Sequence, residues 1–274
     1  MNKKVLIKLG GAALTESTAL GATTAAIHAF RDEGYDVILV HGGGPAINAE
    51  LQARGIEWSF VNGQRVTTPL MMKSIESTLS GVVNRSLVRH FGVNGIPAVG
   101  FSGVDHQTLQ CTPASPELGL VGRIDRVNAE WIGDMLNLPT KPLPVIAPLG
   151  VGPEGECYNI NADWSAAHLA TALKVDQLLF LTDQPGILDE EGQVIRTVNI
   201  AGLGNLIEAK MVTGGMMTKT SAVIYALNNG VPLVRVMNAQ NAAEDVPAGH
   251  LGTRCFVTFP STETVMEEAR CVAV

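Results

Sequence analysis

The rest of this chain is arranged around the segment Val37-Ile-Leu-Val-His-Gly-Gly-Gly-Pro45. It is a short apolar run that ends in three consecutive glycines, and a helix-compatible segment follows it. This order predicts a buried strand, a glycine turn and the start of a helix. The bare N–H groups of such a turn, next to a helix N-terminus, favour an anion. A tight turn without any ligand explains this stretch equally well, so the rest of the chain must decide.

A second glycine turn lies before this one in the chain. The strand Val5–Leu9 runs into Gly10 and Gly11, and an Ala-rich helical segment covers Ser17–Glu33. Two strand–glycine–helix units therefore follow one another. In a parallel sheet both turns emerge at the carboxyl edge, where open α/β folds bind ligands. Lys8 ends the first strand beside its turn, although a lysine there could also simply extend into solvent.

The composition suits an α/β protein and argues against several functions. Of 274 residues, 46% are hydrophobic, only 5% are aromatic and 29 are glycines, as expected for Val- and Ile-rich strands between Ala-rich helices. The net charge of −7 argues against non-specific nucleic-acid binding. The sequence has no signal-peptide pattern and no apolar run near the ~20 residues of a membrane span. We expect a cytoplasmic protein without nucleic-acid or membrane partners.

The four cysteines are predicted to be free thiols in a reducing compartment, because none are spaced as CxxC and no histidine lies at metal-ligand spacing from them. They are Cys111, Cys157, Cys255 and Cys271. Among the scattered histidines only His41 lies near the candidate site, and we interpret it as structural.

The remaining pattern predicts roughly eight strands alternating with about eight helices, which is a doubly wound α/β sheet sandwich. A hairpin is expected around Asn62–Gly63. Pro69 is expected to open a long helix that ends near His90. A second, small hairpin is expected within Thr108–Val127, and the last strand within Gly252–Phe259.

Polar residues also gather at element ends in the second half of the chain. Asn159, Asn161 and Asp163 alternate before an amphipathic helix; one of the last two could merely cap it, which leaves Asn159 unexplained. The apolar strand Asp176–Asp183 ends in Thr-Asp. In Lys210–Lys219 a glycine pair precedes a helix whose first turn carries a lysine.

No familiar phosphate motif is present. Gly214–Thr220 resembles a Walker A motif but lacks the glycine before Lys219, and the triple glycine is followed by Ile47 where a Rossmann motif needs glycine. Two lysines at glycine-bounded element ends, glycine N–H donors and one Asp remain. That set suits phosphoryl transfer, in which catalysis is mainly positioning and charge stabilisation.

The acceptor of the phosphoryl group is predicted to be a carboxylate. A hydroxyl acceptor needs a general base, and none is evident in the sequence. A carboxylate, with a pKa of about 4, is already ionised at neutral pH. Arg65, just past the expected hairpin turn, offers a fork suited to a substrate carboxylate.

Five segments in order resemble the signatures of the amino-acid kinase superfamily, most closely those of its acetylglutamate kinase family. They are Lys8-Leu-Gly-Gly11, His41-Gly-Gly-Gly-Pro45, Asn62-Gly-Gln-Arg-Val-Thr67, Asn159-Ile-Asn-Ala-Asp163 and Gly214-Gly-Met-Met-Thr-Lys219. The similarity runs from Lys4 to about Arg254. It implies an open three-layer αβα sandwich around a mainly parallel central sheet of about eight strands. Residues 1–174 would bind the amino acid and form the dimer, and residues 175–274 would bind ATP.

This resemblance implies ATP-dependent phosphorylation of the γ-carboxylate of N-acetyl-L-glutamate, the second step of arginine biosynthesis. Lys8 and Lys219 would stabilise the transferring phosphoryl group, Asp163 would organise both lysines, and Gly11 and Gly44 would donate N–H bonds. The acceptor would be bound by Gly43, Gly44, Arg65 and Asn159. The nucleotide would be bound by Lys8, Gly10, Gly11, Thr182, Asp183, Gly186, Ile187, Leu188, Lys210, Met211, Val212, Thr213 and Lys219. Mg²⁺ would be held mainly through the ATP phosphates, with no protein metal site.

Some features depart from the family pattern. Ser102–His106 fits only loosely the glycine-rich segment common there, and Gln184-Pro185 is unusual in the nucleotide turn. Because Lys8 lies so near the N-terminus, we expect none of the N-terminal helix of arginine-inhibited relatives. We therefore expect a homodimer without arginine feedback, with the long helix from Pro69 as its interface.

Two alternatives stay open. A sister kinase would act on N-acetyl-aminoadipate, one methylene longer, or on a carrier-linked amino acid; a methylene is worth only about 1–3 kcal/mol of discrimination. A non-catalytic nucleotide or amino-acid sensor could share the fold. The joint presence of Lys8, Asp163 and Lys219 argues against the sensor.

Overall fold

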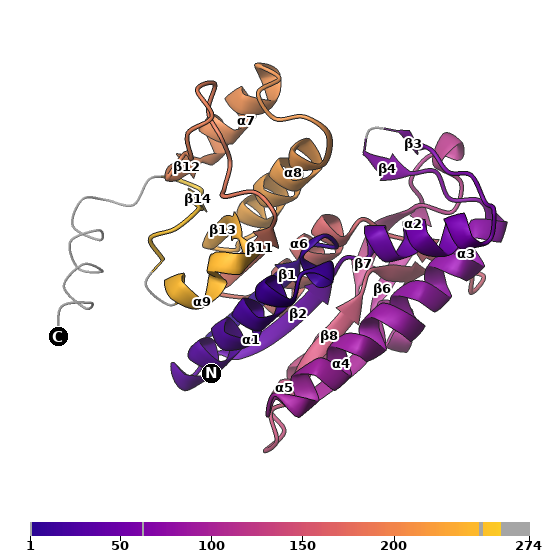
Figure 1. Cartoon of the computed structure of the whole chain (residues 1–274), viewed down its shortest axis with the longest axis horizontal. Helices are drawn as coiled ribbons and strands as arrows, with labels where there is room; N and C mark the ends of the chain where they lie inside the picture. The colour runs from indigo at the N-terminus through magenta and orange to yellow at the C-terminus, as the bar shows by residue number, and fades with distance from the viewer. Residues whose placement is uncertain (1, 62, 247–248, 259–274) are drawn as a thin grey trace.

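A computed structural model describes residues 2–61, 63–246 and 249–258 of the protein. Its centre is an eight-stranded sheet (Figure 1). The strands of this sheet are β1 (Lys4–Leu9), β2 (Asp36–His41), β5 (Ala98–Ser102), β8 (Leu143–Ala147), β11 (Gln177–Thr182), β12 (Thr197–Asn199), β13 (Leu233–Asn238) and β14 (Thr253–Phe256). Their spatial order is β12-β14-β13-β11-β1-β2-β8-β5, and every pairing is parallel except β13 with β14. The predicted mainly parallel sheet is confirmed.

Helices cover both faces of this sheet. They are α1 (Ser17–Asp32), α2 (Gly44–Ala53), α3 (Pro69–Glu76), α4 (Asn84–Val93), α5 (Glu130–Leu136), α6 (Ala162–Leu173), α7 (Ile200–Glu208), α8 (Gly214–Asn228) and α9 (Ala242–Asp245). A π-helical segment, η2 (Ser77–Val83), joins α3 to α4, so the predicted long helix is present with a distorted middle. Short 3-10 turns complete the chain at η1 (Ala13–Thr15), η3 (Asp105–Gln107), η4 (Pro116–Leu118) and η5 (Ala239–Asn241).

The alternation of side chains along β1 divides the core into two layers. Val5, Ile7 and Leu9 pack on one face with residues of α1 and α4. Leu6 points to the other face and packs with residues of α6 and α8. Because side chains alternate along a strand, Lys8 shares the face of Leu6 and lies beneath α6 and α8. This parity brings the lysine of the first turn toward the second half of the chain.

Two smaller sheets accompany the central one. A four-stranded sheet in the order β10-β9-β6-β7 contains the predicted hairpin, β6 (Leu109–Pro113) with β7 (Gly122–Val127). Its other strands, β9 (Leu149–Val151) and β10 (Cys157–Asn159), were not predicted. The antiparallel hairpin β3 (Phe60–Val61) with β4 (Gln64–Arg65) is also confirmed, although Asn62 lies outside the described residues.

The hairpin β3–β4 reaches across to α8, which belongs to the C-terminal half of the chain (Figure 1). A methyl group placed on Gly63 would lie 3.5 Å from both the carbonyl oxygen of Gly214 and Oγ1 of Thr218. The tip of the hairpin therefore lies against the first turns of α8.

Other sequence-based expectations have mixed outcomes. Cys111, Cys157 and Cys255 are free thiols as predicted, whereas Cys271 lies outside the described residues. The last strand ends at Phe256, earlier than predicted, and Phe259 is again outside the described part. Within the described ranges, no helix has the length and apolar character needed to cross a membrane.

Candidate active site

The two glycine turns meet at the carboxyl ends of β1 and β2. Leu9 pairs with His41, and the Gly42 N–H donates to the Leu9 carbonyl at 2.8 Å. A Cβ atom on Gly11 would lie 2.9 Å from the nitrogen of Gly44 and 3.1 Å from that of Gly43. Real Cβ atoms do not approach backbone so closely, so these turns can touch only as glycines. The contact places the start of α2 directly beside the first turn.

Three charged side chains meet between the halves of the chain. Lys8 on β1 lies 2.8 Å from Oδ1 of Asp163, in the first turn of α6. Lys219, near the start of α8, donates to both oxygens of the same carboxylate at 3.0 and 3.1 Å. All three residues are buried. Asn161 caps α6 by accepting from the Asp163 N–H at 2.9 Å, which frees the Asp163 carboxylate for the lysines.

One carboxylate serving two ammonium groups explains the acid–base properties of this cluster. Burial would raise the pKa of Asp163, but the charges of Lys219 and Lys8 outweigh it and lower that pKa to about 2. Burial lowers the pKa of Lys219 to about 8; the charge of Lys8 adds to this shift, whereas Asp163 and Asp183 oppose it. The Lys219 ammonium is therefore under-compensated, and an added anion would stabilise it.

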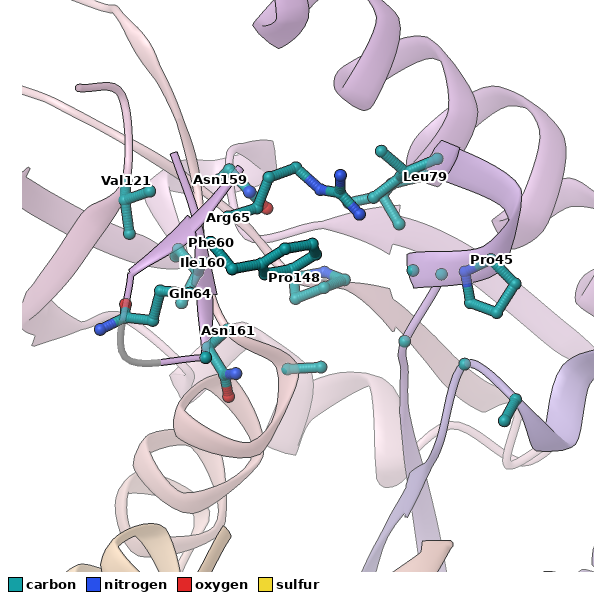
Figure 2. Close-up of a pocket in the computed structure, with 18 of the residues that line it drawn as sticks. Pro45, Phe60, Gln64, Arg65, Leu79, Val121, Pro148, Asn159, Ile160 and Asn161 are labelled. Carbon is teal, nitrogen blue, oxygen red and sulfur yellow. The ribbon is translucent and has the colours of Figure 1, made fainter. Parts of the chain in front are cut away.

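A cavity of about 310 Å³ opens between the hairpin β3–β4 and the glycine turns (Figure 2). It is lined by Lys8, Gly11, Ala12, Gly42, Gly43, Gly44, Pro45, Ile47, Phe60, Gly63, Gln64, Arg65, Leu79, Val121, Pro148, Asn159, Ile160, Asn161 and Ala162. The N-termini of α2 and α6 both border this cavity, and helix N-termini attract anions. The structure thus brings Lys8, Gly43, Gly44, Arg65 and Asn159 together, as the sequence predicted.

Arg65 is held as a buried cation with spare hydrogen-bonding capacity. Its guanidinium lies 4.7 Å from the ring centre of Phe60 and 5.7 Å from that of Trp58. One nitrogen, Nη2, donates to Oδ1 of Asn48. The other, Nη1, is buried without a hydrogen-bond partner among the described residues. A buried donor without a partner is costly, so this group is suited to an anionic ligand in the cavity.

Asn159 approaches the same cavity from β10. Its Nδ2 donates to Oγ1 of Thr67 at 3.1 Å, which fixes the amide group. Figure 2 shows Asn159 among the residues that line the cavity. The sequence missed several residues that complete the wall, notably Phe60, Leu79 and Pro148. These are apolar residues from separate segments, and no local motif marks them.

Except for Lys8, Gly10 and Gly11, the residues predicted to bind the nucleotide lie in the C-terminal half. Thr182 ends β11, and the Gly10 N–H donates to Leu181 at 2.9 Å beside it. The turn Asp183–Leu188 follows, with the Ile187 N–H donating to Oγ1 of Thr253 at 2.8 Å. The connection of α7 to α8 contains Lys210, Met211, Val212 and Thr213. In the described structure none of the residues 182–188 or 210–213 lines the 310 Å³ cavity.

The loosely matching segment Ser102–His106 forms a local turn. The Asp105 carboxylate accepts from the backbone N–H and the hydroxyl of Ser102, at 2.7 and 2.8 Å. The described residues contain no group of three or more His, Cys, Asp or Glu side chains that could hold a metal ion. Among the described residues, the charges at the site are those of Lys8, Arg65, Lys219 and Asp163, with the Asp183 carboxylate near enough to act on Lys219.

An αβα fold in which two buried lysines share one aspartate beside the glycine turns is suited to phosphoryl transfer. The chain belongs to the amino acid kinase family, whose model matches residues 3–238. It is 39% identical over 241 residues to the acetylglutamate kinase of Geobacillus kaustophilus, covering 88% of this chain and 92% of that protein. It is 37% identical over 236 residues to the acetylglutamate kinase of Dinoroseobacter shibae, and the match covers 86% of this chain and 82% of that protein.

Solved structures share the same architecture. That of smu.665 from Streptococcus mutans UA159 has a TM-score of 0.81 at 26% identity, covering 94% of this chain and 100% of that one. Carbamate kinase from Giardia lamblia bound to AMP-PNP has a TM-score of 0.65 at 17% identity, and the match covers 94% of this chain and 99% of that one. At the latter identity the similarity shows the fold alone.

Proposed function

We propose that this protein transfers the γ-phosphoryl group of ATP to the γ-carboxylate of N-acetyl-L-glutamate, forming N-acetyl-L-glutamyl 5-phosphate. The observation that carries this proposal is the buried Lys8–Asp163–Lys219 cluster beside the glycine turns and the cavity containing Arg65. Relatives at 37–39% identity named acetylglutamate kinase support the choice of substrate. The reaction is the second step of arginine biosynthesis.

In the proposed mechanism the acceptor occupies the cavity. Arg65 would bind the α-carboxylate with its free Nη1, and Asn159 would hold the acetylamino group. The γ-carboxylate, already ionised, would face Lys8 and the N–H groups of Gly11, Gly43 and Gly44. Negative charge developing on the transferring group would then meet preorganised donors, which is the main source of catalysis in phosphoryl transfer.

The nucleotide would approach from the opposite side. Residues 182–188 and 210–213, together with Gly10, are the proposed nucleotide contacts, and Lys219 would bind its phosphates. Asp163 would then orient both lysines without meeting the substrate. Mg²⁺ would be held mainly by the ATP phosphates. On this basis we divide the chain into an acceptor lobe of residues 1–174 and a nucleotide lobe of residues 175–274.

The proposal is tested by incubating the purified chain with ATP, Mg²⁺ and N-acetyl-L-glutamate and trapping the acyl phosphate as a hydroxamate. We expect hydroxamate only with all three components. A parallel series with N-acetyl-aminoadipate and with unacetylated glutamate measures specificity. Faster turnover of the longer acid would assign the protein to the sister activity. ATP binding without any acyl phosphate would make it a sensor.

The cellular setting is part of the same proposal. We infer a cytoplasmic homodimer that is insensitive to arginine. The α3–η2–α4 helix, which presents the exposed Leu70, Val82 and Val93, is the proposed interface. Sedimentation would detect a hexamer, and assays with millimolar arginine would detect feedback; either result would contradict this part alone.

A further inference from the structure

His41 ends β2 directly before the triple glycine and is completely buried. Its Nδ1 lies 2.8 Å from the carbonyl oxygen of Gly42. A carbonyl oxygen can only accept, so Nδ1 carries the proton and donates it. The imidazole therefore holds the first peptide group of the turn that the acceptor cavity needs.

This bond also fixes the direction of the next N–H group. The Gly42 carbonyl and the Gly43 N–H belong to one planar trans peptide, so they point to opposite sides. Since the carbonyl faces His41, the Gly43 N–H faces away from the ring. Gly11 is a close neighbour of this peptide, because a Cβ atom on Gly11 would lie 3.1 Å from the Gly43 nitrogen. Both Gly11 and Gly43 line the cavity.

Asn84 fixes the imidazole from its other side. Its Nδ2 lies 3.1 Å from Nε2 of His41, 2.9 Å from the Val145 carbonyl and 3.3 Å from the Phe101 carbonyl. Because carbonyl oxygens only accept, the amide nitrogen of Asn84 faces them, and its two hydrogens are shared among three acceptors. Nε2 of His41 is the unprotonated acceptor, since Nδ1 of the neutral ring already carries the proton. Asn84 is completely buried as well.

The residues around His41 keep its ring neutral and hold the glycine turn in place. Burial lowers the pKa of His41 to about 4, against a smaller opposing effect of its bond to Gly42, so the ring is neutral at physiological pH. Leu79 of η2 packs under Gly43, where a Cβ atom would lie 2.4 Å from the Leu79 Cδ2 atom. The turn is thus supported from below by η2 and from the side by His41.

We propose that His41 and Asn84 are positioning residues that orient the Gly42–Gly43 peptide so that the Gly43 N–H meets the phosphoryl group in transit. This inference rests on the proposed function. Neither side chain touches the substrate; both act through the glycine backbone.

Two substitutions of His41 separate this role from simple packing. In His41→Asn the amide nitrogen can replace Nδ1 and still donate to Gly42. In His41→Gln it can replace Nε2 and reach only toward Asn84. Both remove the ring, so similar losses of thermal stability are expected. We expect kcat to fall about 10²-fold in His41→Gln, the usual cost of losing one oriented N–H donor, and less than about tenfold in His41→Asn. Equal losses, or a larger loss in His41→Asn, would overturn the proposal.

The same pair of substitutions at His90 is the matched control. His90 bonds Thr24 through Nε2 at 2.9 Å, remote from the cavity. His90→Asn and His90→Gln should leave kcat unchanged and differ only in stability. Asn84→Leu should lower kcat about tenfold with little change in either KM. An unchanged kcat in Asn84→Leu would remove Asn84 from the pair.

A measurement without turnover keeps this test separate from that of the proposed function. In the wild-type protein at pH 7, ¹⁵N spectra of the His41 ring should show a protonated Nδ1 and a bare Nε2; the reverse tautomer would overturn the proposal. Inorganic phosphate should shift the Gly43 amide resonance in the wild type and in His41→Asn, but much less in His41→Gln. Equal shifts in all three would also overturn it, even if the wild type formed no acyl phosphate.

Discussion

The acceptor side and the nucleotide side of the site differ in how completely they are built. On the acceptor side Lys8 and Arg65 are buried, and the glycine turn is held by backbone contacts and by His41. On the nucleotide side Asp183, Lys210 and Thr213 are exposed. The cavity lies wholly among residues of the first 162 positions. The acceptor side therefore has an enclosed cavity, whereas the nucleotide side combines buried residues, such as Thr182, Ile187 and Lys219, with turns that are open to solvent.

Substitutions on the two sides should change different kinetic constants. Preorganised donors lower the barrier to the chemical step, because no reorganisation is needed at that moment. Contacts made by exposed turns contribute mainly to binding. Changes on the acceptor side should thus alter kcat or the acceptor KM, and changes on the nucleotide side the KM for ATP. Substitutions on each side test this division.

Lys8→Arg should have the largest effect. The planar guanidinium cannot take the place of a compact ammonium against Asp163 and the transferring group. We expect kcat to fall roughly 10²–10³-fold, with ATP binding retained in calorimetry. Lys73→Arg, at an exposed position of α3, is the control and should leave kcat unchanged. Unchanged turnover in Lys8→Arg would exclude Lys8 from the mechanism.

Arg65→Lys should act on acceptor binding. Lysine loses the fork and its stacking on Phe60, so a charge-assisted pair worth about 1.5–3 kcal/mol is weakened. The KM for N-acetylglutamate should rise roughly 10–100-fold in initial-rate assays, with the KM for ATP within about twofold. Arg54→Lys, whose guanidinium is exposed beside Glu50, is the control. If both KM values rose equally, the division into two sides would be wrong.

The activity should depend on pH through Lys219, which contacts Asp163 between the two sides of the site. Lys219 must be an ammonium to stabilise the phosphoryl group, and its pKa is lowered to about 8. As pH rises above that value the ammonium loses its proton, so kcat/KM should fall about tenfold per pH unit. Because Asp163 raises the pKa of Lys219, the residual activity of Asp163→Asn should decline at a lower pH than the wild type. A profile that stays flat to pH 9.5, or no displacement in Asp163→Asn, would argue against this role for Lys219.

Thr253→Val should have the smallest effect, confined to the nucleotide side. It removes the acceptor of the Ile187 N–H, at 2.8 Å in a buried position, while keeping the shape of the side chain. One such bond is worth about 1 kcal/mol, so the KM for ATP should rise about fivefold and the acceptor KM should not change. Thr253→Ser keeps the hydroxyl and should behave as the wild type. A rise in the acceptor KM would show that the turn 183–188 serves both sides.

Much of the fold could be predicted from the sequence because apolar runs and glycine turns are local patterns. The apolar runs of β1 and β2 each end in glycines, and parallel pairing follows from the alternation of strands and helices. The strands β9, β10 and β12 were not predicted, because each is only three residues long. The antiparallel pairing of β14 depends on contacts with β13 rather than on any local pattern.

The site was predictable to a similar extent. Glycine-bounded element ends marked Lys8 and Lys219, and the alternating polar residues before a helix marked Asp163. Strand parity explains why Lys8 meets the other two. Local sequence could not reveal that Arg65 stacks on Phe60 or that Asn84 reaches His41, 43 positions away. These contacts depend on packing between distant segments. The roles of individual site residues and the boundary at residue 174 stay predictions.

The π-helical segment η2 determines which changes of length this chain can tolerate between α3 and α4. Its position sets the rotational phase between α3, which buries Met71 and Ile75, and α4, which buries Leu87 and Phe91. A π turn holds about one residue more than an α turn, so η2 accommodates an extra residue while the buried faces of α3 and α4 stay aligned. Deleting one residue from η2 should therefore convert it to regular α-helix and be tolerated about as well as a deletion in the exposed turn 190–192. A deletion within α4, between Leu87 and Phe91, would instead turn Phe91 by about 100° away from the core and should be far more damaging.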